Sequence, residues 1–132
     1  MRTTIAFLGL GAMGSRMASN LQAAGYALRV YNRDRAKARP FAEKGAQACD
    51  TPAAAVQGAS YVVSMVADDV ATRAVMLGAD GAVAAATAGT IIIDSSTNTP
   101  AMARELRELC VLDRLLRGLP HGLHGRIIPL MR

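Results

Sequence analysis

Three glycines directly behind an apolar segment limit what this chain can fold into. They stand at positions 9, 11 and 14 in the stretch FLGLGAMGSRMASNL, residues 7–21. The segment TTIAFLGL before and into them is β-branched and apolar at almost every position, which is typical of a strand buried on both faces of a parallel sheet. From Ala12 to Ala24 apolar residues recur at helical spacing, and Gly25 follows where a helix would end. The glycines are therefore predicted to join a buried strand to a helix.

Strands and helices are predicted to alternate along the rest of the chain. ALRVYN, YVVSMV and TIIID have the composition of strands, and AQAC that of a shorter one. Helices are expected at 33–45, after the Thr51–Pro52 pair, from Asp68 to Leu77, as a short turn in GAVAAATA, and after the Thr99–Pro100 pair. Such alternation gives βαβ units with right-handed crossovers. The expected fold is α/β: a Rossmann-type, doubly wound parallel sheet, incomplete at its C-terminal side.

The spacing of the three glycines also indicates a binding site. Gly9 would permit a tight turn, Gly11 would leave room for a phosphate against the backbone, and Gly14 would let the helix approach the strand. The N–H groups at the start of the helix would then bind the pyrophosphate of a dinucleotide. A bare GxGxxG is a weak signal, and the alternative is that the glycines serve only a tight strand-to-helix junction. The predicted strand and helix around them favour the dinucleotide.

The stretch YNRDR, residues 31–35, follows the second predicted strand, where a dinucleotide's adenosine ribose would lie. Asn32 carries no charge, while Arg33 and Arg35 offer guanidinium groups that can bind a 2′-phosphate through two hydrogen bonds. These residues favour NADP over NAD. Asp34 is the counter-argument, because a shifted register would bring its carboxylate to the ribose, and a solvated helix start is the other alternative.

Composition and charge exclude several classes of protein. The 132 residues are 52% hydrophobic, which fits one globular domain. The net charge of +5 arises in the tail, since residues 1–113 carry 11 basic and 10 acidic side chains, so no nucleic-acid partner is expected. No run reaches the roughly 18 apolar residues of a membrane span. Cys49 and Cys110 lack metal-site spacing, and we expect no metal and two reduced thiols in a cytoplasmic protein.

Taken together and in order, GLGAMGSRMASNL, YNRDRAKA, SMVADD, GADG and IIIDSSTNTPAMAREL resemble the β-hydroxyacid dehydrogenase family over residues 4 to about 110. This family includes 3-hydroxyisobutyrate dehydrogenase, tartronate semialdehyde reductase and glyoxylate or succinic semialdehyde reductase. The resemblance implies that Thr97 contacts the nicotinamide and that Ser96 lies on the substrate side. It also implies a set of cofactor-contacting residues in three loops: Gly9, Leu10, Gly11, Ala12, Met13 and Gly14; Asn32 and Arg33; Val66 and Ala67.

One departure bears on function: Val66 and Ala67 stand where the family commonly has Leu-Pro. Capping of the next helix is the alternative role for Ser95, Ser96, Thr97 and Thr99. A functional role is favoured for Ser96 and Thr97, while Ser95 and Thr99 fit either role. Imine reductases share a similar glycine loop and Asn-Arg pair, and they remain a neighbouring alternative. The acid in IIIDSST fits the hydroxyacid enzymes better.

The resemblance ends after Leu109. We expect an NADP-binding domain over 1–110 and an atypical basic tail over 111–132, formed by a helix extension and then a disordered segment. The tail suggests a frameshifted or truncated family member, and the alternative is a natural short variant whose LDRLLRG lengthens the helix. In the family the general acid/base is a lysine beyond this domain, and neither Lys37 nor Lys44 matches it.

Two functional hypotheses follow. In the first, the chain belongs to an NADP-dependent oxidoreductase that acts on a small 3-hydroxy acid or semialdehyde. In the second, it is a dinucleotide-binding module without turnover of its own, and no catalytic residue is assigned within it.

Overall fold

The computed structural model describes residues 2–116, and the side chains of residues 2–112. The chain divides into two compact units, residues 1–98 and 99–132. In the first unit strands and helices alternate in the order β1 (Thr4–Leu8), α1 (Ala12–Ala23), β2 (Ala27–Tyr31), η1 (a 3₁₀ turn, Arg35–Ala38), α2 (Arg39–Glu43), β3 (Gln47–Ala48), α3 (Pro52–Val56), β4 (Tyr61–Ser64), α4 (Asp69–Leu77), α5 (Ala82–Ala85) and β5 (Ile91–Asp94). The second unit contains α6 (Pro100–Leu116). Tail residues 117–132 lie outside the described part of the chain, and so does what we expect of them.

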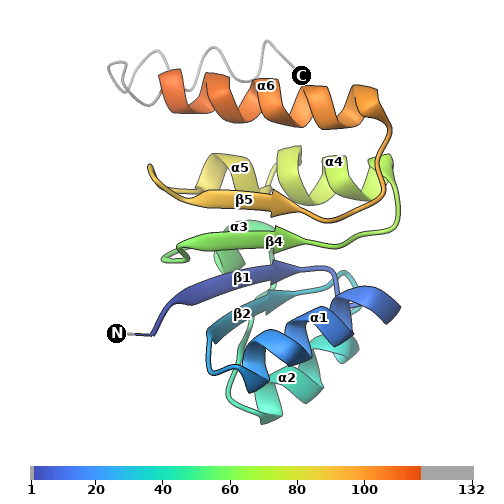
Figure 1. Cartoon of the computed structure of the whole chain (residues 1–132), viewed down its shortest axis with the longest axis vertical. Helices are drawn as coiled ribbons and strands as arrows, with labels where there is room; N and C mark the ends of the chain where they lie inside the picture. The colour runs from blue at the N-terminus through green and yellow to red at the C-terminus, as the bar shows by residue number, and fades with distance from the viewer. Residues whose placement is uncertain (1, 117–132) are drawn as a thin grey trace. The chain divides into compact units, whose positions relative to one another are not determined.

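The five strands of the described chain form one parallel sheet in the order β3-β2-β1-β4-β5. Strand order reverses between β1 and β4, which makes the sheet doubly wound as predicted. In Figure 1 helices α1 and α2 lie on one face of the sheet, and α3 and α5 lie on the other. In a sheet of this kind, ligands bind beyond the carboxyl ends of the strands at the point of reversal.

The core follows from the burial pattern of the strands. Four of the five residues of β1 are buried, as predicted for a central strand. The side chains on the α1–α2 face pack into one cluster of buried residues: Ile5, Phe7, Leu10, Ala18, Leu28, Val30, Ala38, Phe41 and Val63. Strand β5 lies at the edge of the sheet and is much less covered, because Ile91 and Ile93 are 52% and 44% exposed.

Local signals place most helix starts as expected. The Thr51 hydroxyl accepts a hydrogen bond from the Ala54 N–H, Asp68 caps α4 through the Ala71 N–H, and Thr99 caps α6 through the Met102 N–H. These side chains satisfy N–H groups that have no partner within the helix.

The helix predicted over 33–45 is wrong as one continuous element. The chain forms the 3₁₀ turn η1 and then the short helix α2, with Pro40 in the first turn of α2. Proline lacks an N–H and its ring collides with the carbonyl four residues earlier, so a helix cannot run through this position undisturbed.

Gly14 fixes the approach of α1 to the sheet. It is buried in the first turn of α1, and a Cβ added there would lie 2.1 Å from the Gly9 carbonyl oxygen. The Gly9 carbonyl belongs to the backbone, so no change of side-chain rotamer can relieve this clash. The close packing of strand and helix expected of the third glycine is therefore present.

We expect Gly14→Ala to lower the free energy of unfolding by about 3 kcal/mol, because α1 must move away from the strand it follows. Gly11→Ala is the matched control. A Cβ at Gly11 would have no atom within 4 Å, and its φ of −71° suits any residue. This control should cost less than about 1 kcal/mol. Urea unfolding measures both, and equal stabilities of the two variants would contradict the packing argument.

Candidate functional site

The loop between β1 and α1 lies at the reversal point of the sheet. Gly9 has a φ of +100°, which favours glycine, and its N–H donates to the Tyr31 carbonyl of β2 at 2.9 Å. A Cβ at Gly9 would lie 2.3 Å from the Met65 carbonyl oxygen, just past β4. The first glycine therefore lets the loop pass between the ends of β2 and β4, and this combination of turn and close approach requires glycine.

The start of α1 is open. Gly11 is the N-cap, and no side chain caps the helix. A Cβ added at Gly11 would have no atom within 4 Å. The first turn of α1 contains no acidic residue. The free N–H groups of a helix start, together with its positive dipole end, favour an anion. This open helix start, where no atom lies within 4 Å of a Cβ added at Gly11, fits the pyrophosphate predicted from the sequence.

The other residues of the predicted phosphate loop take different positions. Leu10 is 2% exposed and its side chain belongs to the core, so it can contribute only backbone to a ligand. Ala12 is exposed, and Met13 is 59% exposed on the first turn of α1.

Asn32 ties the glycine loop to the end of β2. Its Oδ1 accepts a hydrogen bond from the Leu10 N–H at 2.8 Å, and its Nδ2 donates to the Asp34 carbonyl at 3.0 Å. The amide thus joins two backbone segments that are separated by more than 20 residues in the sequence. This supporting contact was not part of the sequence prediction, which placed Asn32 beside the adenosine.

The three charged residues after Asn32 have distinct surroundings. The Asp34 carboxylate accepts from the Ala36 N–H and caps η1. Arg35 forms a salt bridge of 3.3 Å with Asp50, in which both side chains are 75% exposed. Arg33 is exposed, and among the described residues it makes no salt bridge. Of the two arginines predicted to bind phosphate, Arg33 is the one that no carboxylate within the described residues engages.

The loops after β4 and β5 are joined by a hydrogen bond. The Val66 N–H donates to the Ser96 Oγ at 2.9 Å, while Ala67 and Thr97 are exposed. Val66, Ala67, Ser96 and Thr97 thus follow the carboxyl ends of two neighbouring strands. The structure brings these predicted residues to the same edge of the sheet as the glycine loop.

Sequence reasoning missed a polar network behind these two loops. Ser64 and Asp94 are register partners at the last positions of β4 and β5, and the Ser64 hydroxyl donates to the Asp94 carboxylate at 2.7 Å. Asn98 donates to the same carboxylate and accepts from the Thr72 hydroxyl of α4. Ser64 and Thr72 are fully buried. The available signal was a polar residue at the end of each of two adjacent apolar strands.

Other chemistry is not supported by the described residues. Burial raises the pKa of the Cys49 thiol, and this effect outweighs the lowering by Arg29, so Cys49 is no activated nucleophile. No group of three or more His, Cys, Asp or Glu within residues 2–116 is placed to hold a metal. No helix in that range is long and apolar enough to span a membrane.

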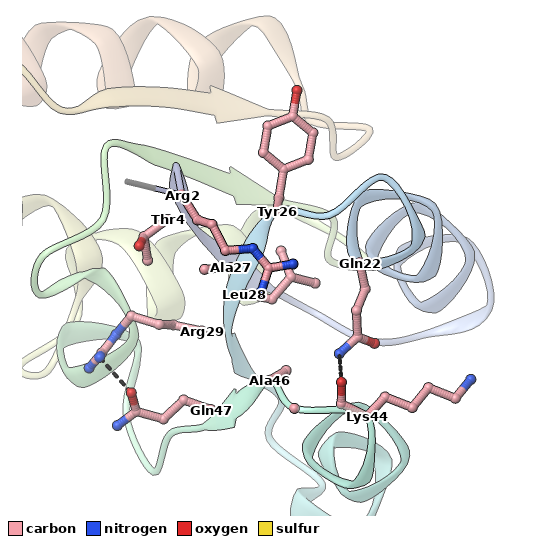
Figure 2. A pocket seen from close by; sticks show the side chains of 11 residues that line it. Arg2, Thr4, Gln22, Tyr26, Ala27, Leu28, Arg29, Lys44, Ala46 and Gln47 are labelled. Atoms are coloured by element: carbon pink, nitrogen blue, oxygen red, sulfur yellow. Dashed lines mark hydrogen bonds between the residues drawn. The ribbon is translucent and has the colours of Figure 1, made fainter.

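A hollow of about 340 Å³ lies at the opposite edge of the sheet, where β1, β2 and β3 begin. Figure 2 shows that Lys44 points away from it and that Gln22 donates to the Lys44 carbonyl. Arg29 donates to Gln47 and to the carbonyls of Ala54 and Ala55, at the end of α3. These polar groups serve the packing of the strand starts, and the hollow is separate from the glycine loop.

The family model for the NAD binding domain of 6-phosphogluconate dehydrogenase matches residues 4–115. The chain belongs to this family. An NAD-dependent L-serine dehydrogenase of Pseudomonas aeruginosa is 37% identical over 120 residues, which is 86% of this chain and 40% of that protein. The dinucleotide-binding domain predicted from the sequence is therefore confirmed at the level of the domain.

Solved structures agree with the family assignment. A 3-hydroxyisobutyrate dehydrogenase of Mycobacterium tuberculosis, with L-serine, is 37% identical with a TM-score of 0.74, covering 83% of this chain and 37% of that one. A reductive aminase of Aspergillus terreus, in complex with NADPH and ethyl levulinate, is 31% identical with a TM-score of 0.70, covering 85% of this chain and 38% of that one. The resemblance to hydroxyacid dehydrogenases is confirmed, and this chain spans under half the length of these relatives.

We expect Asn32→Ala to lower the free energy of unfolding by about 1–2 kcal/mol, because the Leu10 N–H loses its acceptor in a largely buried place. Amide exchange at Leu10 should accelerate in the same variant. Asn20→Ala, at an exposed position of α1, is the matched control and should leave both measurements nearly unchanged. If Asn32→Ala behaves like this control, Asn32 does not hold the loop.

Proposed function

We propose that this domain binds NADP(H) in preference to NAD(H). The charges and hydrogen bonds of residues 32–35 support the proposal. The residue at the end of β2 is a neutral amide held by two backbone groups, and the nearest carboxylate, Asp34, is engaged in capping η1. An acid that binds both ribose hydroxyls, as NAD sites use, is thus not offered at position 32, while the Arg33 guanidinium is available for a 2′-phosphate.

The residues proposed to hold the dinucleotide lie in the loops described above. The pyrophosphate would lie against Gly11 and the N–H groups at the start of α1, which includes Ala12, Met13 and Gly14. The adenosine side would face Asn32 and Arg33, with Arg35 beyond them, and the loop of Val66 and Ala67 would line the cofactor. Thr97 would meet the nicotinamide, and Ser96 would lie on the substrate side. When bound, the nicotinamide supplies or accepts a hydride.

For a protein that contains this domain we propose oxidoreduction of a small 3-hydroxy acid or semialdehyde. The likeness to 3-hydroxyisobutyrate dehydrogenase supports this substrate class. Such a reaction needs a proton donor held against the substrate oxygen. The only lysines of the sequence are Lys37 in η1 and Lys44 at the end of α2, and neither follows the carboxyl end of a strand at the reversal point. We therefore propose that residues 1–110 supply cofactor binding and that turnover depends on residues outside them.

The likeness to the NADPH-bound reductive aminase keeps imine reduction as a second candidate. A turnover assay of a protein containing the domain, with a semialdehyde and with a cyclic imine, separates the two. We further propose a cytoplasmic location and no nucleic-acid partner. The free thiol of Cys49 supports the location.

Arg33→Ala tests the cofactor preference. We expect the Kd for NADPH to rise about tenfold or more, because at least one charge-assisted hydrogen bond to the 2′-phosphate is lost. The Kd for NADH should change less than about twofold. Arg39→Ala, which removes an equal charge at the exposed start of α2, is the matched control and should change neither. Fluorescence titration of the reduced dinucleotides measures all three proteins. Tighter binding of NADH than NADPH by the unaltered chain would refute the preference.

Gly11→Ala tests the place of the pyrophosphate. The added methyl meets no protein atom within 4 Å, so the fold should tolerate it, but it occupies the space expected for the phosphate. The Kd for NADPH and NADH should both rise at least about tenfold, while the thermal midpoint of the free protein stays close to that of the unaltered chain. Unchanged affinity in a folded Gly11→Ala variant would show that the dinucleotide binds elsewhere.

A further inference from the structure

Asp94 stands where two neighbouring strands end. It is the last residue of β5, paired in register with Ser64 at the end of β4. Its Oδ1 accepts hydrogen bonds from the Ser64 hydroxyl at 2.7 Å and from the Ser96 N–H at 3.1 Å. Because Ser64 is fully buried, its hydroxyl needs a partner inside the protein. Asp94 supplies that partner and at the same time holds the first turn of the loop after β5.

The second carboxylate oxygen connects the same residue to α4. Asp94 Oδ2 accepts from the Asn98 side-chain amide, and Asn98 Oδ1 accepts from the Thr72 hydroxyl at 2.8 Å. Thr72 is fully buried in α4. One carboxylate therefore joins the end of β4 through the Ser64 hydroxyl, the loop after β5 through the Ser96 N–H, and the helix α4 through Asn98.

The network reaches the proposed cofactor site through Ser96. The Ser96 Oγ accepts from the Val66 N–H at 2.9 Å, and the Ser96 backbone is itself fixed by Asp94. We propose that Asp94 is a positioning residue for dinucleotide binding, which holds residues 65–67 in the arrangement that receives the cofactor. This inference rests on the proposed function, because it concerns the same site. It also gives Ser96 a supporting role on this loop, in addition to the substrate-side role implied by the family.

The chemistry of the network explains why an acid stands at position 94. An ionised carboxylate only accepts hydrogen bonds, and here it receives three donors, from Ser64, Ser96 and Asn98. Alanine would leave all three without this acceptor. Asparagine could retain the contacts if the Asn98 amide turned over, since the Thr72 hydroxyl can accept as well as donate. Asp94→Asn is therefore the conservative variant and Asp94→Ala the disruptive one.

Amide hydrogen exchange of the free protein tests the positioning role without any cofactor. In Asp94→Ala the Val66 N–H should exchange at least about tenfold faster, because its acceptor Ser96 is no longer held. The Met65 N–H, bonded to the Leu8 carbonyl at 2.9 Å, should keep its rate. Asp80→Ala removes an equal charge from an exposed turn between α4 and α5 and should change neither rate. Equal exchange of Val66 in the folded Asp94→Ala variant and the unaltered chain would overturn the proposal.

Binding measurements extend the test. The Kd for NADPH should rise about tenfold in Asp94→Ala, whereas in Asp94→Asn it should stay close to the value of the unaltered chain. If Asp94→Ala does not fold, Ser96→Ala breaks only the last link: it should accelerate exchange at Val66 and raise the Kd, and Ser96→Thr should restore both. A Ser96→Ala variant that leaves Val66 exchange and the Kd unchanged would overturn the proposal. Should the unaltered chain bind neither NADPH nor NADH, the proposed function fails, while the exchange experiment still decides the role of Asp94.

Discussion

The contact between Gly14 and the Gly9 carbonyl governs the geometry of this domain. The two residues lie at opposite ends of one short turn, and no side chain fits between them. Their approach sets the direction in which α1 leaves the sheet, and hence the direction of its uncapped N-terminus. The open space at Gly11 belongs to the same turn. The chain turns back between Gly9, which lies against the residue that follows β4, and Gly14, which lies against the Gly9 carbonyl. A strand-to-helix junction and an anion cradle are here one structure.

Two side chains hold the loops around this cradle from either side of the reversal point. Asn32 joins the glycine loop to the end of β2, and Asp94 joins the loops that follow β4 and β5. Both act on backbone N–H groups, directly in the case of Leu10 and through Ser96 in the case of Val66. Loops at a sheet edge are mobile unless such bonds order them. A site ordered before the ligand arrives loses less conformational entropy on binding.

The sequence predicted the parts of the molecule that depend on near neighbours. The buried strand β1, the helix α1, the caps at Thr51 and Thr99, the helix start at Asp68 and the tight packing at Gly14 all follow from rules that act within a few residues. The break of the helix at Pro40 could have been placed from the sequence, because a proline inside a predicted helix is itself a local signal for a break. The network at Asp94 could not, because Ser64 and Asp94 are 30 residues apart and meet only once β4 and β5 are known to be adjacent and in register. Strand order is set by packing of the whole sheet, which periodicity does not encode.

The neutral amide at the end of β2 connects local structure to the cofactor preference that we propose. An aspartate at position 32 could accept the Leu10 N–H as well as the amide does, so that bond alone does not require asparagine. The second bond does, because the Asp34 carbonyl oxygen faces the Asn32 nitrogen and would repel a carboxylate. The turn that begins η1 thus favours a donor at position 32. An acid there, of the kind that binds a ribose diol, would lose this bond and with it one of the two contacts through which Asn32 joins the glycine loop to the turn after β2. In the proposed NADP site, the neutral amide at position 32 and the exposed Arg33 therefore act in the same direction.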